Sequence, residues 1–562
     1  MKKRTSKGWF ARMMAAAMVL SLVPGMAFAA TAPVNEPFGV GTLGSTYWRI
    51  PAMVTVDDGT VVAAADARWN HGGDAGDIDT LVSVSDDNGA TWTTPEYVLT
   101  AEGDKATFMD PALATDGSTI YMVADVYPAG VAIVGGDKYP SESKAFDSNG
   151  NLLLAANGSS SYNYYLSNGQ IYSSNGAVVE GYTVDDKFNL LQNGTVVSNL
   201  FYSDAAYQVV PTTFLCLTKS TDGGETWSDY TLLNVKNSGE SFYGVGPGRG
   251  VVTEDGRVVF ACYSHKKGTF SNTEYTSFIY SDDGGATWTR TANMSTKGSE
   301  AAVTEADGML FAFSRTSSTD NSSLTYYVSF DDGATWSKKS NSKIDPNTSC
   351  EMSAITYSRT IDGKTAILLS CPAGKKSSGF LGMGADHGRK NGKIFVGLVN
   401  EDGSLDFSSV SATQVNGSKE FFAYSCLTEL ADGSVGLLYE CDADSSGTDG
   451  IVYSMFTAEE LFDDAVIGPG DTDSDDTGAD DNTGSGEDTG SGDNTGSGED
   501  TGSGDNTGSG EDTGSGDNTG SGEDTGSGDT GSDDTGSDDS ETEEDTGKSA
   551  FEKWLEKLFG RG

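Results

Sequence analysis

Short apolar runs rich in β-branched and aromatic residues recur along the chain, and four of them lead into one pattern, Ser-x-Asp-x-Gly-x-Thr-Trp. The runs, such as DTLVSV and TYYVSF, have the length and composition of strands. Within the pattern, Asp can bond backbone amides just beyond it, Gly supplies a left-handed conformation, and Trp can bury the hairpin. Each copy therefore predicts a strand, a tight turn and a second strand. The copies begin at Ser85, Ser220, Ser281 and Ser329.

The spacing of these copies predicts a repeat-built, all-β fold. The middle two start 61 residues apart and the last two 48 apart, which suits one four-stranded β-propeller blade for each repeat. The first gap, of 135 residues, contains an insertion at about 130–207 that is rich in Asn, Ser, Gly and Tyr. We expect a β-propeller over residues 30–467, with this insertion as a β-rich excursion from one blade.

Positive charge followed by an apolar run marks the N-terminus. Lys2, Lys3 and Arg4 precede the apolar stretch 13–23, and the small-residue triplet Ala-Phe-Ala follows at 27–29. This is the pattern of a secretory signal peptide, and the apolar run is shorter than the ~20 residues needed to span a bilayer. We therefore expect residues 1–29 to be a signal peptide and the protein to be secreted or associated with the cell surface.

The chain changes character at about residue 468. Residues 471–547 contain 26 Asp or Glu and no Lys or Arg, which is more than half of the net charge of −48. A polar tract of this kind cannot bury a core, so we expect 468–547 to be a disordered acidic linker that serves as a tether or spacer. Residues 548–562 predict a short amphipathic helix. Two interpretations of it stay open: docking on a partner or the cell surface, and a helix that does not fold alone.

Charge and cysteine content exclude several kinds of partner. The acidic sum argues against nucleic acid, because binding there rests on neutralising phosphates with Lys and Arg. The six cysteines are spread without CxxC spacing, so we predict no zinc or redox site and expect no metal and no cofactor. Disulfide pairing and buried free thiols both stay open for them. They are Cys216, Cys262, Cys350, Cys371, Cys426 and Cys441.

Three hairpins centred on Asp-Gly turns place charged or phenolic residues at their open ends. In RIPAMVTVDDGTVVAAADAR the turn lies midway between two arginines, so an unbulged antiparallel pairing brings both to the same end. Two further hairpins show the same symmetry. The paired residues are Arg49 with Arg68, Glu300 with Arg315, and Tyr424 with Glu440.

The blades of a propeller direct equivalent strand ends toward one face, where the inner ends converge on the central axis. The six paired residues are therefore expected to form one site. An excess of arginine in such a site favours an anionic ligand, because guanidinium groups bind carboxylate bidentately. For any single residue of the six, an ordinary surface ion pair is the alternative.

Taken together, these segments resemble the bacterial exo-sialidase family. The resemblance covers about residues 36–460, and its combination of RIP upstream with Tyr-Ser-x-Leu downstream is more specific than the octapeptide turns alone. It implies a six-bladed β-propeller that acts as a retaining exo-α-sialidase on terminal sialic acids of glycoproteins, glycolipids and oligosaccharides. The matching segments are YWRIP (47–51), the four octapeptide turns, RWNHGGDAGDID (68–79), FMDPAL (108–113), YSCLTEL and LLYE.

The resemblance implies three catalytic residues. Tyr424 would be the nucleophile, Glu300 the base that takes its proton, and Asp74 the acid/base. Sialic acid carries a carboxylate on its anomeric carbon, so a carboxylate nucleophile would meet a like charge costing about 4 kcal/mol, which a neutral phenol avoids. Asp77 and Asp79 are rivals of Asp74 on the same loop, although Asp79 precedes a strand and is better interpreted as a turn or capping residue.

Seven further residues are implied in substrate binding. Three arginines would grip the substrate carboxylate, with Lys390 and Lys393 as alternatives to the third. A glutamate would orient the first arginine, and the remaining residues would line the pocket around O4 and the N-acyl group. The seven are Arg49, Arg315 and Arg389, then Glu440, and then Arg68, Met109 and Asp110.

One departure and two rival functions accompany the resemblance. The loop after the first hairpin leads into SVSDDNG where many relatives have paired arginines, which concerns local support only. A sialic-acid-binding adhesin or lectin on the same scaffold is one rival. A trans-sialidase, including an intramolecular one, is the other.

Overall fold

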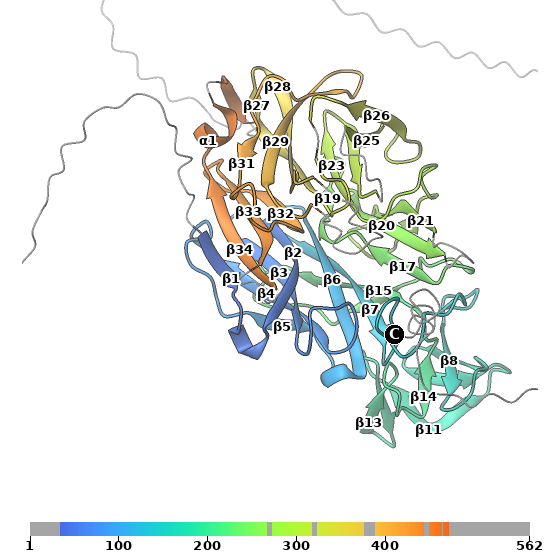
Figure 1. The fold of residues 1–562 in the computed structure, drawn as a ribbon. Helices are drawn as coiled ribbons and strands as arrows, with labels where there is room; N and C mark the ends of the chain where they lie inside the picture. The colour runs from blue at the N-terminus through green and yellow to red at the C-terminus, as the bar shows by residue number, and fades with distance from the viewer. Residues whose placement is uncertain are drawn as a thin grey trace, which may run out of the picture. The chain divides into compact units, whose positions relative to one another are not determined.

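The computed structural model describes residues 34–266, 273–316, 323–344, 346–375, 388–442, 449–463 and 465–470. The expected signal peptide, the expected terminal helix and all but the first residues of the expected acidic linker lie outside these ranges. Within them the chain is almost entirely β-strand and connecting loop, and its mainly antiparallel sheets are arranged like the blades of a propeller, with their inner strands toward a common centre (Figure 1). None of the helices described there is long and apolar enough to cross a membrane.

The first eight propeller strands form two antiparallel groups. A parallel bridge between Ile78 and Thr107 joins the groups into one nine-stranded sheet, in which β18 also pairs with β6. The first group is β2 (Tyr47–Thr55), β3 (Val61–Arg68), β4 (Ile78–Ser85) and β5 (Glu96–Leu99). The second is β6 (Ala106–Thr115), β7 (Ile120–Pro128), β15 (Phe214–Ser220) and β16 (Thr231–Leu233), with β18 (Gly248–Arg249).

Three more sheets follow in chain order. The first holds β17 (Phe242–Val245), β19 (Val251–Val252), β20 (Val258–Lys266), β21 (Thr273–Ser281) and β22 (Thr289–Arg290). The second holds β23 (Ala301–Ala306), β24 (Met309–Ser314), β25 (Leu324–Ser329) and β26 (Ser337–Asn341). The third holds β27 (Ser353–Ile361), β28 (Lys364–Pro372), β29 (Gly392–Val399), β30 (Leu405–Asp406), β31 (Thr413–Gln414) and β35 (Ile467–Gly470).

The last propeller sheet joins the two ends of the folded region. Its order is β1-β34-β33-β32, so the first described strand pairs with the last strand but one. Hydroxyl contacts join neighbouring inner strands, as between Thr55 of β2 and Thr428 of β32 at 2.9 Å. Its strands are β1 (Val34–Phe38), β32 (Ser425–Glu429), β33 (Val435–Asp442) and β34 (Asp449–Phe456).

The short helices lie at the edges of these sheets. A capping box formed by Thr457 and Glu460 starts α1 (Ala458–Phe462). Strand β35 pairs with β27 and reaches Gly470, three residues into the segment expected to be linker. Two 3₁₀ turns precede strands, namely η1 (Thr42–Gly44) and η2 (Gly103–Lys105).

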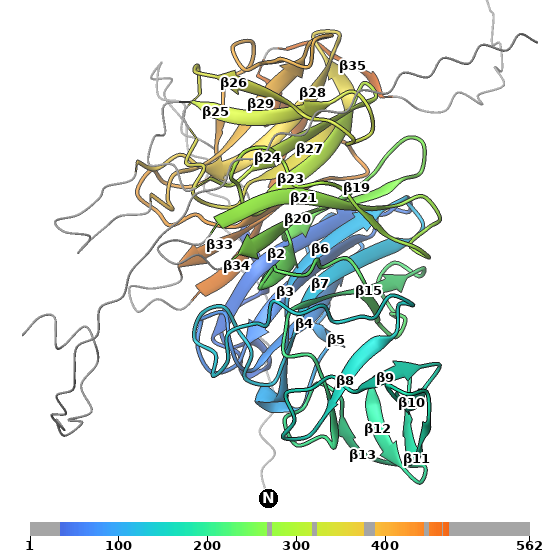
Figure 2. The ribbon, with the colours of Figure 1, turned by 90° about the vertical axis from the view of Figure 1, so that its right-hand side faces the viewer.

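The segment between β7 and β15 builds a separate seven-stranded sheet, which projects from the β7–β15 side of the propeller (Figures 1 and 2). Its buried residues Leu154 and Leu190 belong to the same apolar cluster as Phe214 and Cys216 of β15, so this sheet and its blade share a core. Its strands are β8 (Leu152–Ala156), β9 (Tyr164–Ser167), β10 (Gln170–Ser173), β11 (Val178–Val184), β12 (Asn189–Gln192), β13 (Thr195–Asn199) and β14 (Tyr207–Val209).

The four octapeptides form turns of one design. In the first, Ser85 Oγ donates a hydrogen bond to Asp87 and accepts one from the N–H of Gly89. The Asp87 carboxylate accepts hydrogen bonds from both the backbone amide and the side-chain hydroxyl of Thr91. The Trp92 indole donates to the carbonyl of Gly89 at 3.1 Å. The copies that begin at Ser220, Ser281 and Ser329 repeat these bonds.

Five of the six cysteines are buried thiols that form no disulfide among the described residues. The sixth, Cys441, is half-buried. Burial raises the pKa of these five above the usual range, so the thiols are protonated and unreactive. The five are Cys216, Cys262, Cys350, Cys371 and Cys426.

The hairpin registers confirm two of the three predicted pairs. Glu300 lies opposite Arg315, and Tyr424 lies opposite Glu440, each through backbone hydrogen bonds that extend the ladder. The pairing of Arg49 with Arg68 is wrong, although both lie at the open end. The turn pairs Thr55 with Val61, which displaces the predicted count by one residue, and a bulge between Arg49 and Ala52 displaces it by one more, so that Arg49 lies opposite Asp66.

Candidate active site

Two β-bulges set the backbone around the site. Ile50 and Asp110 both have a φ of 59°, which is rare for residues other than glycine, and each lies where the register of its hairpin shifts. A carboxylate holds each of these amides: Ile50 donates to Glu440 at 3.1 Å, and Asp110 donates to Asp66 at 2.9 Å. The bulges therefore take Ile50 and Asp110 out of the regular ladder, next to the paired residues Arg49 and Met109.

Tyr424, Glu300 and Arg315 form a closed triangle of hydrogen bonds. The Tyr424 hydroxyl donates to Glu300 Oε1 at 2.7 Å, and Arg315 Nη1 donates to Glu300 Oε2 at 2.6 Å and to the Tyr424 oxygen at 2.8 Å. Tyr424 is 6% exposed. Burial, followed by the charge of Glu300, raises the pKa of Tyr424 well above its usual value, so the phenol is neutral until an adjacent base takes its proton.

Three guanidinium groups surround this phenol. Arg49 and Arg389 each lie 5.4 Å from the centre of the Tyr424 ring, and Arg315 contacts the hydroxyl. Glu440 is buried and accepts a bidentate pair of hydrogen bonds from Arg49, at 3.0 and 3.3 Å, which fixes the plane of that guanidinium. The arrangement concentrates positive charge where an anionic ligand would meet the phenol.

Asp74 reaches the same arginines from the loop between β3 and β4. Its Oδ1 accepts a hydrogen bond from Arg68 Nη1 at 2.7 Å and lies 3.7 Å from Arg49 Nη1, yet its side chain is 56% exposed. Partial burial raises the pKa of Asp74, but the charges of Arg68 and Arg49 outweigh this effect and lower the pKa below its usual value. A bound anion that offsets these charges would raise it again.

Arg68 is fully buried and holds this loop in place. It donates to the carbonyl of Gly72 at 2.8 Å and to Asp66 at 3.0 Å, besides its bond to Asp74. Asp66 was not among the predicted residues. Burial raises its pKa to about 6, although the charge of Arg68 opposes this. The sequence signal was its position two residues before Arg68, and so on the same face, within an otherwise apolar strand.

Asp110 and Met109 differ in what they offer a ligand. Burial, then the charges of Asp66 and Asp125, raises the pKa of Asp110 well above its usual range. Met109 is 3% exposed and packs among Ile78, Tyr127 and other apolar residues, so its side chain supports the bulge and presents little surface to a ligand.

The two rivals of Asp74 are not equivalent to it. Asp79 is buried and accepts hydrogen bonds from the Trp69 indole at 2.8 Å and from the amide of Ala101 at 3.1 Å. These bonds give it a structural role in joining the loop to β5, in agreement with the sequence interpretation. Asp77 supplies its backbone carbonyl to the amide of Trp69.

A second acidic residue beside the site, Glu351, was not predicted from the sequence. Glu351 is buried beside the site and accepts a hydrogen bond from the amide of Ser425, the neighbour of Tyr424, at 2.9 Å. Burial raises its pKa well above the usual range. Nothing in its local sequence distinguishes it from a surface glutamate. Its role depends on a strand 74 residues away along the chain.

The ten predicted site residues thus come from several sheets. Nine of them are linked by the ion pairs, hydrogen bonds and ring contacts described above, and Met109 lies beneath them. Arg389, which precedes β29, is the cation that borders the phenol, whereas Lys393 lies within β29 itself, opposite Gln414.

Comparison with known proteins places this arrangement in context. The family model described as BNR repeat-like domain matches residues 50–420. An anhydrosialidase of Macrobdella decora is 32% identical over 70% of this chain and 58% of its own length. Sialidase B of Streptococcus pneumoniae is 30% identical over 73% of this chain and 64% of its own length. The chain therefore spans somewhat under two thirds of these two relatives.

A solved structure matches over nearly its whole length. The intramolecular trans-sialidase of Ruminococcus gnavus in complex with oseltamivir carboxylate is similar with a TM-score of 0.64 and 30% identity, covering 76% of this chain and 98% of that one.

Proposed function

This chain belongs to the sialidase family, and from that premise we propose that it is a retaining exo-α-sialidase that hydrolyses terminal α-ketosidically linked sialic acids of glycoproteins, glycolipids and oligosaccharides. We further propose that its propeller-like sheets are six blades. The observation that carries the proposal is the 2.7 Å hydrogen bond from Tyr424 to Glu300 inside a ring of three arginines.

In the first step the substrate carboxylate is held by Arg49, Arg315 and Arg389. Fixing this anion also stabilises the oxocarbenium-like transition state, because the guanidinium groups are already in place. Glu300 takes the phenolic proton as the Tyr424 oxygen bonds to the anomeric carbon, and the bond from that carbon to the leaving oxygen breaks. Asp74 gives its proton to the leaving oxygen.

In the second step Asp74 acts as a base. It takes a proton from water as the water oxygen bonds to the anomeric carbon, the bond to Tyr424 breaks, and Glu300 returns the proton to the phenol. Two displacements at one carbon retain its configuration.

A second candidate function differs only in this step. Both the Macrobdella relative and the Ruminococcus structure are named for intramolecular or anhydro chemistry. In that alternative a hydroxyl of the bound sugar replaces water, and an anhydro sugar leaves.

One experiment tests the proposal and separates the candidates. The protein is incubated with 3′-sialyllactose, and the products are identified by NMR spectroscopy and mass spectrometry. Free sialic acid whose first-formed anomer is α supports the retaining hydrolase, and an anhydro sugar supports the second candidate. No cleavage would contradict both and favour a sialic-acid-binding adhesin or lectin.

Two parts of the proposal concern residues outside the described ranges. We propose that the N-terminal segment directs secretion, because its charge and apolar pattern fit a signal peptide. We also propose that the acidic C-terminal tail attaches the enzyme at the cell surface. N-terminal sequencing of protein recovered from the medium and from washed cells tests both parts.

A further inference from the structure

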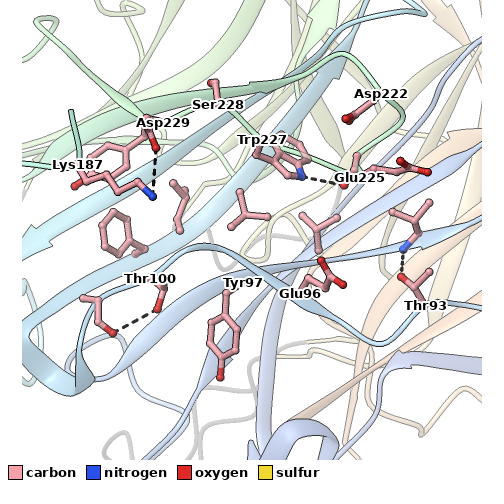
Figure 3. A pocket seen from close by; sticks show the side chains of 18 of the residues that line it. Thr93, Glu96, Tyr97, Thr100, Lys187, Asp222, Glu225, Trp227, Ser228 and Asp229 are labelled. Atoms are coloured by element: carbon pink, nitrogen blue, oxygen red, sulfur yellow. Dashed lines mark hydrogen bonds and ion pairs between the residues drawn. The ribbon is translucent and has the colours of Figure 1, made fainter. Parts of the chain in front are cut away.

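A groove that the proposed catalytic residues do not line runs between the strand group β2–β5, the strand group β6, β7, β15 and β16, and the inserted seven-stranded sheet. Its volume is about 890 Å³, which is within the range of ligand sites. Strand β5 contributes Glu96 and Tyr97, and the turn after β15 contributes Glu225 and Trp227. Figure 3 shows these two sets of side chains on opposite sides of the hollow, with Lys187 of the insertion at one end.

Aromatic rings form firm surfaces in this groove. The Trp227 indole is held by its hydrogen bond to the carbonyl of Gly224 at 3.1 Å and packs on the apolar core beneath it. Tyr97 is 51% exposed, and its ring stacks on Trp69 with centroids 6.0 Å apart. Both rings are therefore fixed in orientation before any ligand arrives, which lowers the entropy cost of binding.

The charge of the lining excludes an anion such as a sialyl group. Six carboxylates line the groove and face one lysine, Lys187, which already lies 3.6 Å from Asp229. The carboxylates of Glu96 and Glu225 are exposed and form no hydrogen bond or ion pair within the described part of the chain. They are available as acceptors for a ligand that donates hydrogen bonds.

The polar lining also contains groups that both donate and accept. Thr100 after β5 and Ser228 beside Trp227 supply hydroxyls, whereas the side-chain amides of Asn189 and Asn199 bond each other and their own segment. A simple cation would use only the acceptors, whereas sugar hydroxyls can use both kinds of group. The apolar face of a pyranose ring also matches a fixed aromatic surface, and burying such surface is favourable.

We propose that this groove is a second binding site, for a neutral oligosaccharide, and that the insertion exists in part to form one of its walls. The site is distinct from the arginine-rich centre in charge and in ligand class. The groove extends along the first group of strands: at one end Tyr97 stacks on Trp69, which directly follows Arg68, and at the other end Thr60 belongs to the turn between β2 and β3.

The test uses calorimetric binding of lacto-N-neotetraose, a neutral tetrasaccharide, to the full chain. We expect binding that Trp227→Ala and Tyr97→Ala each weaken about tenfold, as expected for loss of one aromatic surface. The Tyr97→Ala variant is included because the Tyr97 ring is half exposed, so its removal should leave the fold intact even if Trp227→Ala does not. Trp336→Ala is the matched control: its indole makes the same turn contact, to Gly333 at 3.1 Å, but does not line the groove, and it should bind as the parent does.

Three results would overturn the inference. They are no binding by the parent at up to about 10 mM tetrasaccharide, binding that both groove variants retain unchanged, and a tetralysine peptide that binds more tightly than the sugar and loses its affinity in Tyr97→Ala. Because no step of the test uses catalysis, its outcome is independent of the proposed sialidase activity.

Discussion

The hydroxyl of Tyr424 donates a hydrogen bond to Glu300 at 2.7 Å, although 124 residues separate the two along the chain. Each residue lies at the open end of its own hairpin, directly before β32 and β23 respectively. The contact joins two sheets at the centre of the propeller and pairs a phenol of raised pKa with the one carboxylate that touches it among the described residues. This pairing is the basis of the proposed nucleophile.

The first prediction concerns the base. Glu300→Gln should lower kcat by about 10²–10⁴, because the amide cannot accept the phenolic proton, while the fold stays intact. Steady-state kinetics on a fluorogenic sialoside measures the change. Glu305→Gln, on the same strand but at its turn end, should keep the parental rate. Equal effects of the two substitutions would contradict the assignment.

The second prediction concerns the protonation of Asp74. In the proposed mechanism Asp74 acts as an acid in its protonated form, so kcat/KM should fall as pH rises through its pKa. Burial raises this pKa, but the charges of Arg68 and Arg49 outweigh burial and lower it. Arg68→Met removes one of these charges and should move the falling limb about one pH unit higher. Arg68→Lys keeps the charge and serves as comparator. An unmoved limb in the Met variant would contradict the role of Arg68 in setting this pKa.

The third prediction separates Arg389 from its neighbours. Arg389→Lys should lower kcat/KM about tenfold to a hundredfold, because an ammonium cannot bind the substrate carboxylate bidentately. Lys393→Ala should leave it unchanged, since Lys393 pairs within the β29 ladder. A larger loss of kcat/KM in Lys393→Ala than in Arg389→Lys would show that Arg389 is not the cation that binds the substrate carboxylate.

The fourth prediction concerns stability. Asp125 is fully buried, its Oδ1 accepts a hydrogen bond from the amide of Val245 at 3.0 Å, and its Oδ2 has no hydrogen-bond partner among the described residues. Burial raises its pKa, so the folded state keeps a proton that the unfolded chain releases above about pH 4, and stability is lost as pH rises from there toward the folded pKa. Asp125→Asn should therefore raise the free energy of unfolding by about 1–3 kcal/mol near neutral pH.

The pH dependence of that gain provides its control. Denaturant unfolding at about pH 4.5 and about pH 7.5 should show a larger gain at the higher pH, because only there does the parent bear the full cost of holding the proton. A loss of stability of the same size at both pH values would show that the carboxyl group makes a favourable contact.

Hairpin symmetry was sufficient to predict part of the site from sequence. The pairs Glu300–Arg315 and Tyr424–Glu440 lie in unbulged hairpins, where counting from the turn gives the register. The count fails for Arg49 by two residues, because the turn register is one residue off the predicted centre and a bulge at Ile50 inserts one more. Pro51 within a predicted strand was the available signal, since proline is found at bulges and edges of sheets.

Other features depend on contacts that no local pattern encodes. The burial of Met109 and the support that Glu351 gives to the backbone beside Tyr424 arise from packing between sheets. The groove beside Trp227 is formed by two blades and the insertion together. The sequence predicted that the insertion is β-rich, but it did not show that residues of the insertion would line this groove.

The most direct test of the proposed nucleophile is trapping of its covalent intermediate. A 3-fluorinated sialosyl fluoride has a good leaving group and a destabilised transition state for the second step, so a glycosylated enzyme should accumulate. Intact-mass measurement and peptide mapping should find the sugar on Tyr424 in the parent and no adduct in Tyr424→Phe. An adduct on another residue, or one of equal yield in Tyr424→Phe, would contradict the proposed mechanism.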